Sequence, residues 1–465
     1  MIYGVKLQKL LEQEMESGRG TQGYRGKIRS LLGLSENVDT GEPTMDRAAQ
    51  GLNAKDFSLQ EVAHTFLGPD YRSKVAHALA IGPQLRLQEA EGGVVLPSHF
   101  AHISAFSDTV GGLLDAMILA VYTNPQFIGD DMMEIIPARV QGGKIIGVRN
   151  DGNVSDNLPD GDPYPTVGLG ETYVSIPENE RYGVTVQLNM KTFIYDRTDQ
   201  IQSAADAAGY SVRRKKETRQ ADVVLGKVNT YARDGVGSNT YRTAVLATAA
   251  YNGTAPMSYV NAAASLPLND WQDLNVGIQI LGANTDPATG FEIAIDPKNA
   301  TLWVAPHNEL LTRTILRATN VQTRAGSAVN TGILTQASAV QLNIRNSDNP
   351  LAEYATKLVS SRIWYNRLLL AGVDCTKEGA SGHTGALDAT QALDDDAAHA
   401  RSVWLYGDFK RAFVYRQIVP FSTVQAPLSS EDTRRDIVAV YVASEHGVPF
   451  IREPRYVFQG VNTYT

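Results

Sequence analysis

The sequence predicts an α+β protein with more than one packed region, and three observations support this class. The chain has 465 residues, which is more than one hydrophobic core usually serves. Hydrophobic residues make up 43% and charged residues 20% of the chain, as is typical of ordered globular proteins and not of disordered ones. Helical periodicity dominates the stretch before Tyr122, whereas strand patterns begin near Ile135 and close the chain.

The segment 1–102 consists of short amphipathic helix patterns joined by polar turns. Ser58 and Glu61 form the sequence signature of a capping box before one of these helices. Because the segment lacks the apolar density for a core of its own, we expect a partly helical N-terminal arm that lies on other surfaces. A stronger helix pattern follows from Ile103 to Tyr122, and the residues from Ile135 to Val148 are then predicted to be extended.

The stretch from Asn150 to Gly170 has the composition of a loop, since prolines, glycines and aspartates fill it. A loop of about twenty residues is much longer than an ordinary connection, so it needs either disorder or a docking partner. Strand patterns flank it at 144–149 and at 173–176 with 182–188, which predicts a protruding two-stranded arm. The loop aspartates lack the register of a calcium loop and are either solvated or paired with the basic surface of a neighbouring subunit. They are Asp151, Asp156, Asp160 and Asp162.

The longest predicted helix runs from Asp199 to Tyr231, without a proline, and would be about 50 Å long. Apolar residues recur at helical spacing near both ends, for example at Ile201 and Val224, whereas a charged belt occupies the middle. This pattern predicts a strut that is docked at its ends and exposed in its middle. The basic part of the belt is Arg213, Arg214, Lys215 and Lys216.

Three roles remain open for these four basic residues. They could form a solvated helix face, bind the carboxylates of a partner, or bind a phosphate backbone. The sequence does not rank the last two roles. The loop aspartates of an adjacent subunit are one candidate partner.

A compact mixed α/β region is predicted from about Gly235. It has strand patterns at 291–295 and 302–306 and a helix pattern at 308–316. The polar stretch 374–401 is predicted to be an exposed insertion. Four strand patterns close the chain, at Ser402–Tyr406, Ala412–Ile418, Asp436–Ala443 and Pro449–Val457.

Composition excludes several classes of protein. The net charge of -8 argues against the basic surface of a sequence-specific DNA-binding protein. A single cysteine, Cys375, cannot form an internal disulfide, as expected for a chain made in a reducing cytoplasm. The N-terminal residues are charged where a secretion signal is apolar. The most apolar window, Val110 to Tyr122, contains Asp115 and is too short to span a bilayer, so we expect a soluble cytoplasmic product with no membrane partner.

No motif predicts catalysis or a cofactor. The phosphate-binding loop and the dinucleotide-binding glycine pattern are both absent from the sequence. His99 and His102 have too few further ligands nearby for a metal site, and Cys375 is interpreted as an unreactive cysteine. A carbohydrate hydrolase remains an alternative, because paired carboxylates can be hidden among 50 acidic residues. No spacing supports it, and we predict neither an enzyme nor a cofactor, with no metal site.

Three stretches and the order of the elements resemble the major capsid protein of tailed bacteriophages, which has the Hong Kong 97-type fold. The resemblance covers roughly Ile103 to Val457. TYVSIPENERYGVTVQLNMKTFIYDRTDQI is similar to a hairpin's return strand that leads into the spine helix. LWVAPHNELLTRTIL is similar to the strand, proline and helix of the axial domain. VWLYGDFKRAFVYRQIVPFSTVQAP and RRDIVAVYVASEHGVPFIREPRYVF are similar to the closing strands of the peripheral domain.

The resemblance implies a division of the chain into the parts of this fold. An N-terminal arm would occupy 1–102, and the peripheral domain would begin at 103–143. The extended loop would be 144–185. The peripheral domain would continue over 186–234, with the spine helix at 199–231. The axial domain would be 235–401, with its insertion at 374–401, and 402–465 would supply closing strands of the peripheral domain.

The resemblance also implies a function and partners. The protein would assemble as hexamers and pentamers into an icosahedral shell around double-stranded phage DNA, which it would contact non-specifically. Portal, scaffold and decoration proteins would be its other partners. It would belong to the virion and assemble in the cytoplasm of the host bacterium. An encapsulin-like compartment that encloses a cargo enzyme is the alternative. Because Asn150 to Gly170 contains no lysine, we predict a shell without covalent crosslinks.

Overall fold

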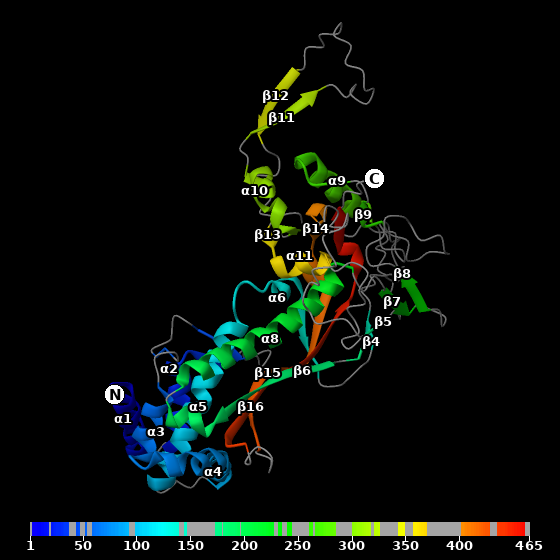
Figure 1. Ribbon diagram of the computed structural model, residues 1–465. Helices are drawn as coiled ribbons and strands as arrows, with labels where there is room; N and C mark the ends of the chain where they lie inside the picture. Colours follow the sequence, from blue (N-terminus) through cyan, green and yellow to red (C-terminus); the bar gives the residue numbers. More distant parts are fainter. Residues whose placement is uncertain are drawn as a thin grey trace, which may run out of the picture.

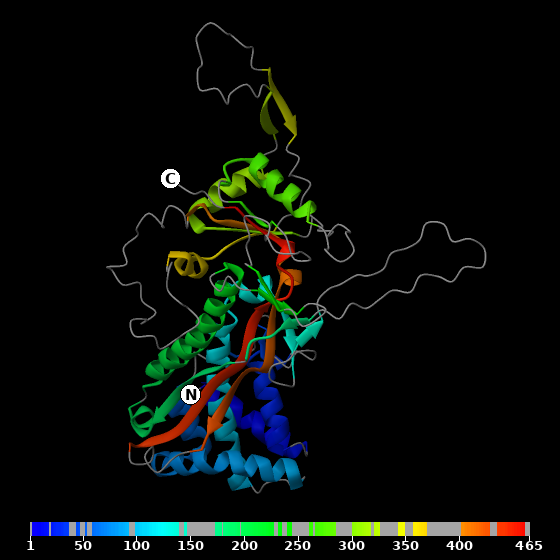
Figure 2. The ribbon, with the colours of Figure 1, turned by 90° about the vertical axis from the view of Figure 1, so that its right-hand side faces the viewer.

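The structure of this chain is a computed structural model, shown in Figures 1 and 2. It describes residues 2–17, 20–36, 43–46, 52–53, 58–92, 98–138, 144–146, 173–178, 180–195, 197–226, 231–234, 240–243, 260–263, 266–284, 300–317, 320–325, 343–348, 357–369, 401–427 and 435–460. The predicted α+β class is confirmed. Helices gather at one end of the molecule, two larger sheets follow, and a long helix runs between the two ends (Figure 1).

The N-terminal helices form the helical end. They are α1 (Ile2–Glu16), α2 (Gly20–Leu31), α3 (Leu59–Leu67), α4 (Tyr71–Gly92) and α5 (Ser98–Tyr122), with a short antiparallel pair of β1 (Leu34–Glu36) and β2 (Pro43–Met45). The predicted cap of α3 is present, since the Ser58 side chain accepts a hydrogen bond from the Glu61 amide. Leu7, Tyr24 and Phe66 are buried in a first core that these helices share with α5. The expectation of an arm that lies on other surfaces is therefore wrong for these helices, which pack into one core with α5 of the same chain.

α5 is the central helix of the first core. Its residues from Phe100 to Tyr122 are long and apolar enough to cross a membrane by length and composition, but 83% of that window is buried inside the protein. The sequence-based estimate of a short apolar window was wrong, because the helix begins earlier than the apolar run. Burial of both its sides explains its composition, since a helix that is apolar all round is expected in the core of a large protein.

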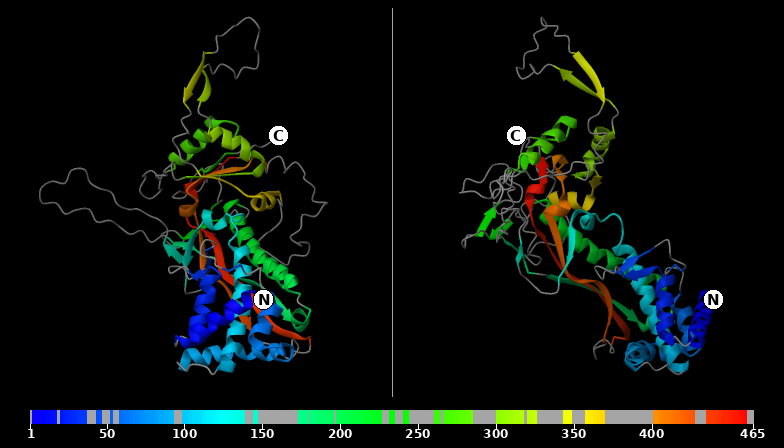
Figure 3. Two further views of the ribbon diagram at one scale, coloured as in Figure 1. Left: turned by 90° about the vertical axis from the view of Figure 1, so that its left-hand side faces the viewer. Right: turned by 180° about the vertical axis from the view of Figure 1, so that it is seen from behind.

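A four-stranded sheet packs against the first core and extends away from it. Its order is β3 (Glu134–Pro137), β15 (Phe413–Ala426), β16 (Ile437–Ile451) and β6 (Glu180–Asn189). β16 is antiparallel to both β15 and β6, and β3 is parallel to the start of β15. β15 and β16 contain 14 and 15 residues, so they reach from the helical end toward the opposite end, as Figures 2 and 3 show.

The long helix α8 (Thr198–Val224) crosses the same span after the short helix α7 (Met190–Ile194). Its first half contributes Ala205 and Val212 to the first core, and its last turns contribute Ala221 and Val224 to a second core. At Gly209 the helix lies against the Ile118 carbonyl of α5 so closely that a Cβ atom would clash. The docking at both ends is thus as predicted.

The end of α8 differs from the expected helix 199–231. The helix stops at Val224, and Gly226 adopts a φ of 70°. A glycine with positive φ just after the last helical residues is a common helix terminator. Tyr231 begins a strand instead, β7 (Tyr231–Asp234).

A five-stranded sheet forms the end opposite the N-terminal helices (Figure 1). Its order is β13 (Lys357–Ser360), β10 (Thr301–Val304), β14 (Trp404–Gly407), β17 (Val457–Gly460) and β9 (Ala262–Ala263). α9 (Trp271–Gly282) and α10 (Glu309–Arg317) share a third core with this sheet, and α11 (Arg362–Leu369) contributes to the second core. A short η2 turn (Pro306–Asn308) leads into α10.

The expectation that residues 402–465 supply strands of the peripheral domain alone is corrected by the sheets to which β14 and β17 belong. Only β15 and β16 join the four-stranded sheet, whereas β14 and β17 pair with each other and complete the five-stranded sheet. α13 (Phe409–Ala412) and η4 (Pro454–Tyr456) connect the strands of one sheet to those of the other. The closing segment therefore ties the two sheets together.

Two smaller sheets lie outside these layers. β4 (Lys144–Ile146) and β5 (Tyr173–Ser175) pair antiparallel, and β7 and β8 (Thr240–Thr243) extend them. The strands expected at 144–149 and 173–176 are thus present as β4 and β5, whereas the strand expected at 182–188 is part of β6, which pairs with β16 in the sheet described above. β11 (Asn320–Ala325) and β12 (Asn343–Asp348) form a hairpin that projects beyond α10 (Figure 1). The loop aspartates 151–162, the strand expected at 291–295 and residues 374–400 of the insertion lie outside the described residues.

Candidate functional site

A concentrated group of charged and polar side chains, all buried except the partly exposed Asp130, surrounds the middle of α8. We call it the α8 charge cluster: Arg213, Lys216, Glu217 and Gln220 of α8 with Asp130 and Glu445. The four α8 residues occupy positions i, i+3, i+4 and i+7 and so share one face of the helix. That face meets α6 (Gly129–Met132) and the four-stranded sheet.

Lys216 lies at the centre of the cluster, and its side chain is 0% exposed. Its Nζ is 3.0 Å from Glu445 Oε1 and 3.3 Å from Asp130 Oδ1, and it stands 4.5 Å from the centre of the Tyr415 ring. Burial alone would lower the pKa of Lys216, but the two carboxylates outweigh it, so the pKa is raised above its ordinary value. The ammonium group therefore stays charged inside the protein.

Glu445 receives hydrogen bonds from several elements at once. Its carboxylate accepts from the Tyr122 hydroxyl at 2.8 Å, the Tyr415 hydroxyl at 3.0 Å and Gln417 Nε2 at 3.3 Å. Together with Lys216 these donors satisfy a carboxylate that is fully buried. Burial, together with neighbours that include Glu445, raises the pKa of Tyr415 well above its usual value, so its hydroxyl keeps the proton that it donates.

Glu217 holds the start of α6 and the first turns of α11. Its carboxylate accepts from the Ile128 and Gly129 amides at 3.0 and 2.9 Å and from Trp364 Nε1 at 2.6 Å. Ile128 caps α6 without a side-chain hydrogen bond of its own, so Glu217 supplies the missing acceptor. Burial raises the pKa of Glu217, against the opposing effects of Arg213 and of these hydrogen bonds.

Asp130 completes the cluster from α6. It forms an ion pair with Arg213 and accepts a hydrogen bond from Gln220 Nε2 at 2.9 Å. Burial would raise the pKa of Asp130, but Lys216 and Arg213 lower it well below its usual range. The cluster therefore pairs its charges internally.

The cluster is a structural joint. It connects α5, α6, α8, α11 and the four-stranded sheet at the seam between the first and second cores. Its central groups, Lys216 and Glu445, are both 0% exposed, so a substrate could not reach them in this arrangement. Among the described residues, no group of three or more His, Cys, Asp or Glu side chains could hold a metal ion.

The predicted basic belt is divided by this packing. Arg213 and Lys216 are buried and ion-paired within the subunit, so the expectation that they form an exposed contact surface is wrong. Arg214 is exposed, and Lys215 is half-buried on the other side of the helix. Burial, followed by the charge of Arg219, lowers the pKa of Lys215 to about 8. Contacts of Arg214 and Lys215 with another subunit stay a prediction, as do those of Asp151, Asp156, Asp160 and Asp162.

Sequence reasoning missed Asp130, Glu445 and the tyrosines of the cluster. The spacing of Arg213, Lys216, Glu217 and Gln220 was a usable signal, because polar and charged side chains at positions i, i+3, i+4 and i+7 share one face. When a helix is docked at both ends, a charged face in its middle can also be buried, provided that other elements of the same chain supply groups that pair with the charges. No local pattern points to Glu445, which lies in β16 and is far away in the sequence.

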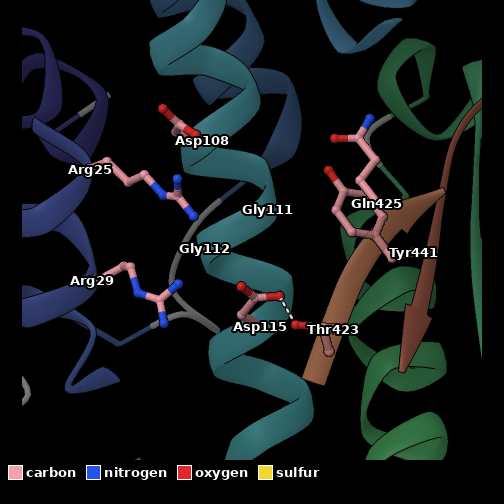
Figure 4. Close-up of a pocket in the computed structure, with 9 residues that line it drawn as sticks. All are labelled: Arg25, Arg29, Asp108, Gly111, Gly112, Asp115, Thr423, Gln425 and Tyr441. Carbon is pink, nitrogen blue, oxygen red and sulfur yellow. Dashed lines mark hydrogen bonds between the residues drawn. The ribbon is translucent and has the colours of Figure 1, made fainter. Parts of the chain in front are cut away.

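A polar cavity of about 100 Å³ lies between α2, α5 and the four-stranded sheet (Figure 4). Arg25 and Arg29 line it from α2, and Asp115 accepts a hydrogen bond from Thr423 on the sheet side. The remaining lining residues are Asp108, Gly111, Gly112, Gln425 and Tyr441. Because guanidinium groups and carboxylates both line it, and its volume suits a few water molecules, the cavity fits bridging water better than a charged ligand.

Solved structures similar to this chain are shell proteins. The mature capsid of bacteriophage PhiM1 matches with 14% identity and a TM-score of 0.37, over 72% of this chain and 87% of that one. The chain resembles phage capsid proteins. The capsid of a native GTA particle matches with 11% identity and a TM-score of 0.36, over 74% of this chain and 92% of that one.

An encapsulin also resembles this chain. The SrpI encapsulin of Synechococcus elongatus matches with 9% identity and a TM-score of 0.35, over 74% of this chain and 91% of that one. No protein-family model and no curated protein matches the sequence.

Proposed function

We propose that this chain is a major capsid protein whose copies form hexamers and pentamers and close an icosahedral shell around double-stranded phage DNA. The observation that carries the proposal is the order of the described elements. A central helix, the base of a hairpin, a long helix, an α/β sheet and two long closing strands follow one another as α5, β4 with β5, α8, the five-stranded sheet, and β15 with β16. This is the order that the resemblance of the sequence to the Hong Kong 97-type fold implies.

The internal construction of the subunit supports this proposal. The four-stranded sheet with α8 would be the peripheral domain, and the five-stranded sheet with α9 and α10 would be the axial domain. Where the structure describes the chain, its buried residues form three separate cores, and α8 joins two of them. The α8 charge cluster fixes that joint with side chains that are buried, apart from the partly exposed Asp130. Such a subunit keeps its shape while its outer surfaces remain available to other copies.

The proposed partners are those of a shell subunit. Other copies of the chain would be the main partner, and the portal, a scaffold and decoration proteins would meet the assembled shell. The shell would be part of the virion and would assemble in the bacterial cytoplasm. Exposed residues such as Arg214 would contact either packaged DNA or the loop aspartates of a neighbour.

The loop contact can be tested directly. In the double variant Asp160→Ala with Asp162→Ala, we expect shells that dissociate more readily at low salt, with a smaller difference at high salt because salt screens exposed charges. Native gels of assembled particles at both salt concentrations measure this. Equal stability of variant and wild-type shells at both salt concentrations would rule the contact out.

Expression of the full chain followed by negative-stain electron microscopy tests the proposed function. We expect closed particles of uniform size. The nucleic acid content of particles purified from infected cells after nuclease treatment separates the two kinds of shell. Packaged double-stranded DNA supports the capsid, whereas protein cargo without a genome supports the encapsulin-like compartment. A chain that stays monomeric and forms no particle contradicts both.

A further inference from the structure

α10 exposes two leucines at the end of the molecule formed by the five-stranded sheet. Leu310 is 78% exposed, the most exposed large hydrophobic side chain among the described residues, and the adjacent Leu311 is 42% exposed. Thr312 is the helix's buried residue, whereas Ile315 and Leu316 are partly buried against the third core. α10 therefore uses one edge for its own core and presents its leucines outward.

Two arginines and one partly exposed glutamate lie beside these leucines on α10. Arg313 and Arg317 are exposed on the same helix, and Arg313 also binds Glu309 through its guanidinium group at 2.6 Å. Because Glu309 is further engaged by the Ser360 hydroxyl at 2.5 Å, its carboxylate is drawn toward the subunit. The face consists of two leucines flanked by two arginines.

α9 carries a complementary surface in the same sheet layer. Asp270 caps the helix, and Asp273 completes the capping box in its first turn, which makes this helix start acidic. One turn further, Val276 is 38% exposed. α9 and α10 pack against the same third core, so both faces belong to one rigid unit.

We propose that the leucine face of α10 on one copy of the chain docks on the acidic, Val276-bearing face of α9 on a second copy. This inference rests on the proposed function and names the surfaces through which copies meet. Leu310 and Leu311 would lie against Val276, and Arg313 and Arg317 would face Asp270 and Asp273. A pairing of α10 with α10 is disfavoured, because it would bring the arginines of both copies together.

The proposed contact is heterologous, since it joins two different faces. Each copy then uses its α10 toward one neighbour and its α9 toward the other. Such contacts generate a ring when the rotation between copies closes and an open filament when it does not. Because the two faces differ, a variant of one face can be mixed with a variant of the other, and this mixture is the strongest test of the contact.

Two variants and a control test whether the contact joins two different faces. Leu310→Asp removes the α10 face and Val276→Asp removes the α9 face. Val424→Asp is the matched control, because Val424 is 59% exposed on β15, which belongs to the other sheet and not to the third core that α9 and α10 share. Self-association is followed by sedimentation velocity of the full-length chains. Circular dichroism and thermal melts confirm that each variant is folded.

We expect Leu310→Asp and Val276→Asp each to weaken self-association by at least about tenfold, because each buries a charge in an apolar contact. Val424→Asp should associate like the wild type. In an equal mixture of the two variants, one intact contact remains between the α9 face of the Leu310→Asp chain and the α10 face of the Val276→Asp chain. The mixture should therefore form dimers that neither variant forms alone.

Several results would overturn the inference. Normal association of Val276→Asp with loss in Leu310→Asp would assign the leucines to a different surface, and a mixture without restored dimers would exclude a heterologous contact. If Leu310→Asp formed shells as readily as the wild type, the proposed contact between α10 and α9 would be refuted, whereas the proposed function would stand. A wild-type chain that never associates would overturn both.

Discussion

α8 and α10 distribute their charged and apolar residues in opposite ways. α8 buries Arg213, Lys216 and Glu217 inside the subunit, whereas α10 leaves Leu310 and Leu311 exposed to solvent. The buried charges are matched by Asp130 and by hydrogen-bond donors from several elements. The comparison shows that the chemical type of a residue does not indicate whether it serves the fold or a partner; its neighbours do.

The largest effect on stability is expected from a substitution in the buried α8 charge cluster. Lys216→Met should reduce the free energy of unfolding by about 3–5 kcal/mol, because it leaves Glu445 buried without its cation. Urea denaturation followed by circular dichroism measures the loss. Lys215→Met is the control, because Lys215 is the adjacent residue of α8, is half-buried and lies outside the cluster.

A second substitution in Lys216→Met sharpens this result. Adding Glu445→Gln removes the unmatched carboxylate, so part of the lost stability should return. If Lys216→Met were as stable as the wild type, the cluster would not be the joint that we describe.

A smaller loss is expected at the contact between α8 and α11. Glu217→Gln should cost about 1–3 kcal/mol. The neutral amide oxygen is a weaker acceptor for the Ile128 amide and the Trp364 indole than the carboxylate, and the new NH2 group would face the Gly129 amide, another donor, in the place of Oε2. Near-ultraviolet circular dichroism should change as well, because the Trp364 indole would donate to a neutral amide oxygen in place of a carboxylate. An unchanged spectrum with unchanged stability would refute this role.

Acid should weaken the cluster through Asp130, with a smaller effect because this side chain is 29% exposed. Its pKa is held below the unfolded value of about 3.9 by Lys216 and Arg213, which outweigh burial. The stabilisation is therefore complete above about pH 5 and is lost as the pH falls through the folded pKa. The difference in unfolding free energy between wild type and Asp130→Asn should shrink over that range. A difference that stays constant with pH would contradict the assignment.

The smallest expected effect on stability concerns α10. Leu310→Asp should change the free energy of unfolding of the monomer by no more than about 0.5 kcal/mol, because the side chain is 78% exposed. Thermal melts of the monomeric fraction measure it. A loss comparable to that of Glu217→Gln would show that Leu310 supports its own fold instead of a partner.

Local patterns in the sequence predicted much of the fold. The helical spacing at Ile201 and Val212 located α8, and the capping signature at Ser58 located the start of α3. The end of α8 was also readable, since Gly226 follows the last apolar residues as a helix terminator does. The expected helix continued past it because Val228 and Tyr231 happened to keep the helical spacing.

The remaining differences come from pairings over long distances in the sequence. β14 and β15 are separated by only the short α13, yet they belong to different sheets, because β14 pairs with β10 and β17. A short apolar run does not say which sheet it joins. In the same way, no pattern near Lys216 points to Glu445, and the burial of the cluster follows from this contact.

Negative-stain electron microscopy of the purified full-length wild-type chain tests the central claim most directly. A shell subunit should yield closed particles of uniform diameter without any added cofactor. If particles form with the wild type and with Val424→Asp but less readily with Leu310→Asp, both the proposed shell and the proposed contact of α10 are supported. A chain that remains monomeric over the accessible concentration range, with no particles in the micrographs, would contradict the claim that it builds a shell.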